Sequence, residues 1–153
     1  MAIKILCQRN PLWAEDKLGS SSLNVYSYGC TTCCISMLSD YFKCYKSPKE
    51  IAHNINNYTK DGLIIWKNLN FEKMQFIRRD WNPSLNGILN AVKNPYTAVI
   101  LEVPLGKGKH WVVALRKDWF SNDFLIADPW DGKKKLVKKT YKNITGAAFF
   151  ARK

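Results

Sequence analysis

This 153-residue sequence contains a few cysteines and histidines, and these are the side chains best suited to catalytic chemistry. Five cysteines stand at positions 7, 30, 33, 34 and 44, and the only histidines are His53 and His110. Cysteine beside histidine is the basis of nucleophilic thiol chemistry, because the imidazole accepts the thiol proton and leaves a thiolate. Such chemistry therefore requires a fold that brings one cysteine and one histidine together.

Cys30 has the local setting of a reactive thiol. It follows Gly29, where a turn-rich segment gives way to a helical pattern that begins at Thr31 and repeats apolar residues every three or four positions. The positive end and free N–H groups of a helix N-terminus stabilise a thiolate. Cys33 and Cys34 fall inside the predicted helix and are expected to pack as small apolar residues. Cys30 is thus the candidate nucleophile, and a plain buried cysteine is the alternative.

His110 and Asp128 are the candidate base and its orienting carboxylate. His110 opens a predicted strand that continues through 111–115, and Asp128 ends the next one. If the two strands form a hairpin, paired residue numbers sum to about 239, which places His110 opposite Asp128 or Pro129. A carboxylate on one imidazole nitrogen leaves the other nitrogen to face a nucleophile. The alternative is that Asp128 and Pro129 only end the strand; His53 is expected to be a surface or half-buried residue.

The cysteine pattern fits neither a disulfide framework nor a complete zinc site. The count is odd, and four of the five cysteines fall within fifteen residues. Cys30 and Cys33 form one C-x-x-C pair, but no second pair and no H-x-x-x-H follows to supply further zinc ligands. We therefore expect reduced, mostly buried thiols, no metal and no cofactor.

The surrounding pattern predicts the elements that must position these residues. A helix begins at Thr31, and a second begins after Ser47, which forms a capping box with Glu50. Further helices are predicted over 62–69 and 84–93, and short strands over 74–78, 97–103, 111–115, 124–127 and 147–151. Helices come early and strands cluster late, which predicts an α+β fold with an antiparallel sheet.

Composition limits the class of protein. Hydrophobic residues make up 46% and charged residues 24%, which are ordinary globular values, so we expect one domain over 1–153. No apolar run is long enough for a transmembrane helix, and the start lacks a signal-peptide pattern, so we expect synthesis in the cytoplasm. The net charge of +12 favours an anionic partner, such as nucleic acid, an acidic membrane surface or a bacterial wall polymer. The alternative is a surface of solvated lysines.

The order of the motifs resembles bacteriocin-processing-type, papain-like cysteine peptidases. The resemblance rests on stretches spread over most of the chain: Gln8 with Asn10-Pro11-Leu12-Trp13, Gly29-Cys30-x-x-Cys33, Ser47-Pro48-x-Glu50, His110-Trp111-Val112-Val113 and Asp128-Pro129-Trp130-x-Gly132. The most similar variants are small peptidase-like domains of phage lytic proteins and bacterial wall enzymes. The resemblance implies a papain-like fold with Cys30 as nucleophile, His110 as base, Asp128 as orienting residue and Gln8 as oxyanion-hole glutamine.

One departure bears on the substrate. Transporter-fused processing peptidases read Cys-Gly-Pro or Cys-Gly at the nucleophile, where this chain has Thr31 and Thr32 after Cys30. We therefore do not expect cleavage of double-glycine leaders. The leading hypothesis is a thiol hydrolase of peptidoglycan peptides or another peptide, which would reach the wall by release or as part of a virion.

The competing hypothesis is a peptidase fold without turnover that binds an anionic polymer. Its binding residues would be the basic runs 133–135 and 138–139. No phosphate-binding loop and no single-strand RNA motif accompanies these lysines, so nucleic acid is not the expected partner. The retention of Cys30, His110, Asp128 and Gln8 in one chain favours the enzyme.

Overall fold

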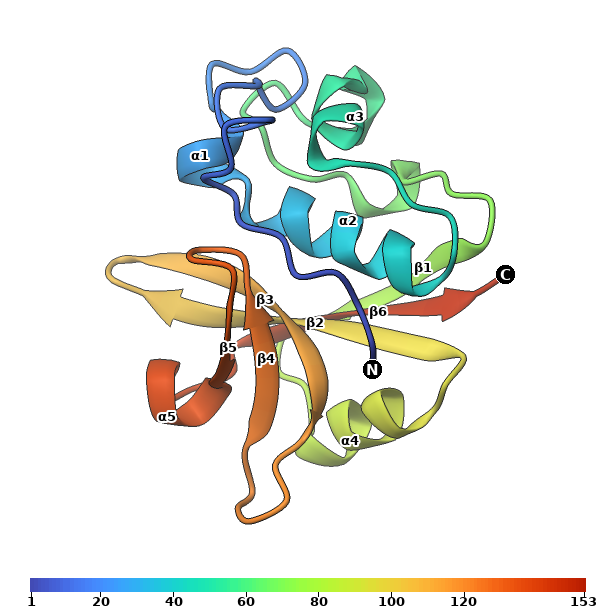
Figure 1. Ribbon diagram of the computed structural model, residues 1–153, viewed down its shortest axis with the longest axis vertical. Coiled ribbons are helices and arrows are strands. Elements are labelled where there is room, and N and C mark those ends of the chain that lie inside the picture. Colours follow the sequence, from blue (N-terminus) through green and yellow to red (C-terminus); the bar gives the residue numbers. More distant parts are fainter.

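The computed structural model describes all 153 residues as helices packed on one antiparallel sheet (Figure 1). The sheet order is β1-β6-β2-β3-β4-β5, and every neighbouring pair is antiparallel. The strands are β1 (Met74–Asp80), β2 (Thr97–Leu105), β3 (Gly108–Lys117), β4 (Phe124–Asp128), β5 (Lys133–Leu136) and β6 (Gly146–Arg152). The helices are α1 (Val25–Tyr28), α2 (Cys30–Tyr41), α3 (Pro48–His53), α4 (Leu85–Lys93) and α5 (Val137–Tyr141), with 3₁₀ turns at Ile55–Asn57 and Trp66–Asn68. The predicted α+β class is confirmed.

Both faces of the sheet are covered, because alternate strand residues point to opposite sides. The larger core holds 23 buried residues between the N-terminal helices and one face, with Cys33 and Leu38 of α2 packed near Val113. The second core holds 12 buried residues on the other face, where α4 and α5 contribute Ile88 and Val137. Figure 1 shows α1–α3 on one side of the sheet and α4 and α5 on the other. None of the helices combines the length and apolar character that crossing a bilayer demands.

The helix predicted after Ser47 is confirmed, and at this helix an N-terminal capping box accompanies the apolar period. Ser47 accepts from the Glu50 N–H and Glu50 reaches back to Ser47, so the capping box of α3 is present. The helix predicted over 62–69 is wrong, because only Trp66–Asn68 forms a 3₁₀ turn. Gly62 has φ +82°, and Tyr58 pairs with Ile64 in an isolated bridge, so this segment folds back as a tight turn.

The β3–β4 hairpin predicted from the sequence forms, with its register one residue further on. Val113 pairs with Ala127, and an irregularity between Ala114 and Arg116 adds an extra residue to β3. Continued by one pair, this register places Val112 opposite Asp128. His110, two residues earlier on the same face, lies diagonal to Asp128 rather than directly opposite as predicted. The diagonal is still within reach of a long side chain.

Candidate active site

Cys30 is the first residue of α2, and Gly29 allows the close approach of α1 that places Cys30 there. The Gly29 N–H donates to the Val25 carbonyl at 2.8 Å, which brings the end of α1 against the start of α2. A Cβ on Gly29 would stand 2.5 Å from the Val25 carbonyl oxygen, so only glycine fits. Because Cys30 opens the helix, its N–H has no acceptor within α2. A half-buried thiol thus sits beside a free N–H at a helix N-terminus.

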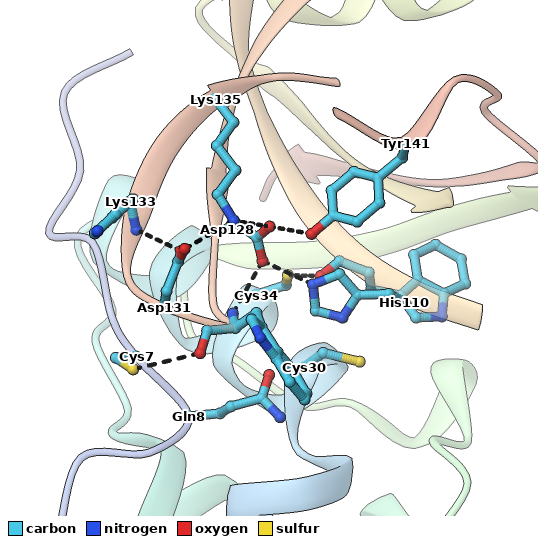
Figure 2. A network of polar contacts seen from close by, with 12 residues as sticks. Cys7, Gln8, Cys30, Cys34, His110, Asp128, Asp131, Lys133, Lys135 and Tyr141 are labelled. Atoms are coloured by element: carbon cyan, nitrogen blue, oxygen red, sulfur yellow. Dashed lines mark hydrogen bonds and ion pairs between the residues drawn. The ribbon is translucent and has the colours of Figure 1, made fainter. Parts of the chain in front are cut away.

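His110 and Asp128 form a buried pair. His110 Nε2 lies 2.7 Å from Asp128 Oδ1, and the two residues are only 2% and 0% exposed. Figure 2 shows the Asp128 carboxylate on one ring nitrogen of His110 and Cys30 on the side of the other. The pair fixes the ring orientation, so that Nδ1 faces the thiol.

The Asp128 carboxylate is held by three further donors. Oδ1 also accepts from the Trp130 N–H at 2.9 Å, and Oδ2 accepts from Lys135 Nζ at 2.9 Å and from the Tyr141 hydroxyl. Burial alone raises the pKa of Asp128, but the hydrogen bonds from His110 and Tyr141 and the ammonium of Lys135 outweigh it and hold that pKa well below its usual range. Asp128 is therefore a fixed anion at neutral pH.

The electrostatics of the site favour a thiolate beside an imidazolium. Burial alone lowers the pKa of His110, but the hydrogen bond to Asp128 and the interaction with the Cys30 thiol raise it to about 9. Burial alone raises the pKa of Cys30, and the interaction with His110 more than compensates, so that pKa lies below the ordinary thiol value. Burial and the nearby Cys30 raise the pKa of both Cys33 and Cys34 well above that value. Among the three cysteines of α2, only Cys30 thus has a lowered thiol pKa.

Gln8 reaches the same place from the N-terminal arm. Its N–H donates to the Pro129 carbonyl and its Nε2 donates to the Tyr26 carbonyl, both at 2.8 Å. The side chain is 1% exposed, and its Oε1 has no partner. The amide carries a second N–H besides the one that Tyr26 accepts, so it can still donate to a bound oxygen.

A cavity of about 430 Å³ joins three of the four predicted residues. Gln8, Cys30 and His110 line it, and Asp128 lies behind His110, fully buried. The remaining wall includes the polar Glu102 and Lys109. Much of the rest is aromatic or aliphatic, including Tyr28, Tyr58, Leu63, Ile64, Trp111 and Trp130. This volume lies in the range of ligand-binding clefts.

Two residues of the site were not predicted from the sequence. Lys135 belongs to the basic run 133–135, which the sequence marks only as a solvated or polymer-binding surface, and no sequence pattern indicates Tyr141. In the structure, Lys133 and Lys134 are exposed, whereas the Lys135 ammonium lies 2.9 Å from both Asp128 and Asp131. β5 itself was not predicted because three successive lysines mask its alternation, and α5 is shorter than two turns.

The other histidine lies elsewhere. His53 is exposed at the end of α3, where its Nε2 lies 2.7 Å from Asp16 Oδ1, and it does not line the cavity. No group of three or more histidine, cysteine, aspartate or glutamate side chains is arranged to hold a metal ion.

Comparison with known families identifies the chain. The model of the Peptidase C39 family matches residues 20–150. This chain belongs to the Peptidase C39 family. The predicted resemblance to bacteriocin-processing peptidases is therefore confirmed, and the helices and antiparallel sheet are the papain-like α+β fold of a C39 cysteine peptidase. Cys30, His110 and Asp128 lie within the region matched to the C39 family, whereas Gln8 precedes it. A comparison with curated proteins gives no match.

Proposed function

We propose that this C39 protein hydrolyses an amide bond of a peptide through a triad of Cys30, His110 and Asp128. The observation that carries the proposal is the buried Asp128–His110 pair, which presents its second ring nitrogen to a thiol at a helix N-terminus. Nucleophile, base and orienting carboxylate are the three parts that thiol-dependent amide hydrolysis needs.

The proposed reaction proceeds by way of an acyl-enzyme. The Cys30 thiolate attacks the carbonyl carbon, and a C–S bond forms as the carbonyl electron pair moves to oxygen. The Cys30 N–H and the free N–H of the Gln8 amide stabilise this oxyanion. The oxyanion then collapses, the C–N bond breaks, and the His110 imidazolium gives its proton to the leaving amine. His110, now neutral, takes a proton from water as the water oxygen attacks the thioester carbon. The C–S bond then breaks, which releases the acid and restores the Cys30 thiolate beside the His110 imidazolium.

Peptidoglycan peptides are the proposed substrate, with other peptides as the broader class. The net charge of +12 favours association with an anionic wall, and Thr31 and Thr32 after Cys30 depart from the leader-cleaving pattern. A wall substrate also requires that the protein reach the wall, which we propose occurs by release from the cell or as part of a virion.

Digestion of purified walls tests the proposal. Walls from several bacteria are incubated with wild-type protein, Cys30→Ser and the matched variant Cys33→Ser, and released peptides are identified by mass spectrometry. We expect release by wild type and by Cys33→Ser but none by Cys30→Ser, because a hydroxyl lacks the acidity of the thiol. Full release by Cys30→Ser would contradict the nucleophile assignment.

The same digestion separates the enzyme from the binding module. Lys133 and Lys134 are exposed on β5 and could hold an anionic polymer without any chemistry. Tight binding of walls by wild type with no released peptide from walls or from peptide mixtures would favour the binding module.

A further inference from the structure

The loop between β3 and β4 exposes two adjacent aromatic side chains. Trp119 is 75% exposed and Phe120 is 91% exposed, which is the highest value among the exposed large apolar residues. Figure 1 shows this hairpin projecting from the body of the molecule, on the side away from α1–α3. Two neighbouring large apolar side chains in water are unfavourable, and on a protruding loop they indicate a binding surface.

Hydrogen bonds hold the loop backbone in a defined turn, and the two aromatic side chains are exposed from this turn. The Asp118 N–H donates to the Asp123 carbonyl at 2.8 Å, and the Ser121 hydroxyl donates to Asp118 Oδ2 at 2.7 Å. Lys117 Nζ closes the loop from the side, at 2.8 Å from the Ser121 carbonyl. These three hydrogen bonds lie within the turn, and the two aromatic side chains face outward.

Basic side chains surround this aromatic tip, which we define as Trp119 and Phe120. Lys93, Arg116 and Lys117 line a hollow together with Trp119, and the Arg116 guanidinium lies 4.0 Å from the Trp119 ring centroid. Lys138 and Lys139 line a second hollow on the other side of the loop.

The acidic side chains near the tip are already engaged. Asp118 accepts from Ser121, and Asp123 is buried and accepts from the backbone N–H groups of Lys138 and Lys139. Five cationic side chains against these two carboxylates leave the surface around the two rings net positive.

We propose that the aromatic tip and the five basic residues around it dock on the surface of an anionic lipid bilayer. Indole and phenyl rings are favourable at the level of lipid headgroups. Lysines and arginines next to them attract anionic headgroups, and stable surface binding needs both contributions together. A wall polymer would satisfy the lysines but would leave Phe120 without an apolar partner, so the exposed ring favours the bilayer.

Docking at the tip and catalysis use opposite ends of one strand. His110 lies near the start of β3 and Lys117 at its end, and seven residues of strand span about 23 Å. Neither Trp119 nor Phe120 lines the catalytic cavity. The tip can therefore be changed without altering the peptidase site, and the two proposals can fail independently.

Vesicle co-sedimentation of the full chain tests the proposal. Vesicles of phosphatidylcholine alone are compared with vesicles of equal parts phosphatidylcholine and phosphatidylglycerol. We expect wild type to bind the anionic vesicles and the double variant Trp119→Ser/Phe120→Ser to lose about 10-fold or more in affinity. Trp81→Ser removes a matched tryptophan, 76% exposed, outside the tip and should bind as wild type. Unfolding temperatures of both variants check that the fold is intact.

Two results would overturn the proposal. The first is wild-type binding to anionic vesicles that is no stronger than binding to phosphatidylcholine. The second is undiminished binding by the folded double variant, because the attraction would then come from net charge alone. Retention of peptide release by the double variant would show that the tip acts separately from the catalytic site.

Discussion

At the scale of single residues, the Asp128 carboxylate combines full burial with four hydrogen-bond donors. It is fully buried and accepts from His110, Trp130, Lys135 and Tyr141. Its charge keeps the neighbouring imidazole protonated, which in turn favours the Cys30 thiolate. In the proposed mechanism, the reactivity of the Cys30 thiol therefore depends on a carboxylate that does not contact it.

Asp128→Asn tests this dependence through the pH profile of hydrolysis. In the wild type the pKa of His110 is about 9, so the imidazolium that donates to the leaving amine persists to that pH and is lost above it. Loss of the carboxylate lowers the pKa of His110 toward the ordinary value. We expect the alkaline limb of kcat/KM to move to lower pH and the rate to fall by about 10² to 10⁴. An unchanged limb would show that Asp128 does not act on His110.

Gln8→Ala tests the second oxyanion donor. Because the Gln8 amide strengthens its contact only as charge develops on the carbonyl oxygen, we expect turnover to fall by about 10² to 10³ with little change in KM. Gln8→Glu should be at least as damaging, since a carboxylate repels the oxyanion. Steady-state kinetics on a released peptide provides the measurement. Wild-type turnover in Gln8→Ala, alongside an inactive Cys30→Ser, would place the donor elsewhere.

Lys135→Met tests a positioning role for the lysine behind the triad. Lys135 holds Asp128 Oδ2 and also offsets part of its charge. Without it, the carboxylate acts more strongly on His110, so we expect the alkaline limb to move to higher pH while kcat falls by up to about 10-fold. Lys134→Met, on the exposed side of β5, is the matched control and should leave both unchanged. A lower kcat without movement of the limb would indicate a merely structural role.

At the scale of elements, the junction of α1 and α2 sets the position of Cys30, the proposed nucleophile. Gly29→Ala would force a methyl group against the Val25 backbone, so the start of α2 must shift. We expect lower thermal stability and loss of most hydrolysis. Gly108→Ala is the matched control, because its added Cβ meets the Leu105 carbonyl at an ordinary 3.8 Å. Equal activity of the two variants would mean that the junction does not position Cys30.

The elements also show how far the sequence alone can be read. α2 and α4 were predicted from their apolar period, and α3 from its capping box. In the structure Ser84 also caps α4, whereas Gly29 gives α2 no side-chain cap. β5 and α5 were not predicted, because a lysine-rich edge strand and a five-residue helix carry little periodic signal. The same gap hid Lys135 and Tyr141. By contrast, Cys30 and His110 are far apart in the sequence, and only the resemblance to the family predicted that they lie close together in the fold.

At the scale of the whole molecule, two features outside the proposed triad bear on the site: the N-terminal arm and the net charge of +12. The arm places Gln8 against Pro129 and Tyr26, and so links the region ahead of the C39 match to the segments that follow Asp128 and precede Cys30. In the proposed function, this charge acts at longer range by concentrating an anionic wall substrate around the molecule.

Salt dependence tests the role of this charge. We expect the rate of wall digestion to fall steeply as ionic strength rises, because salt screens the attraction between exposed charges. Hydrolysis of a short neutral peptide by the same protein should change little and serves as the control. Equal salt dependence for the two substrates would show that net charge does not recruit the wall.

The most direct test of the account is the alkylation rate of each cysteine. The intact protein is treated with iodoacetamide at a series of pH values, and the labelled positions are read by mass spectrometry. We predict that Cys30 reacts first and stays reactive below the ordinary thiol pKa of about 8.5, that buried Cys33 and Cys34 resist, and that His110→Ala removes the advantage of Cys30. Reaction of Cys30 no faster than that of the half-buried Cys7 and Cys44 at neutral pH, or an unchanged rate in His110→Ala, would contradict a His110-activated nucleophile.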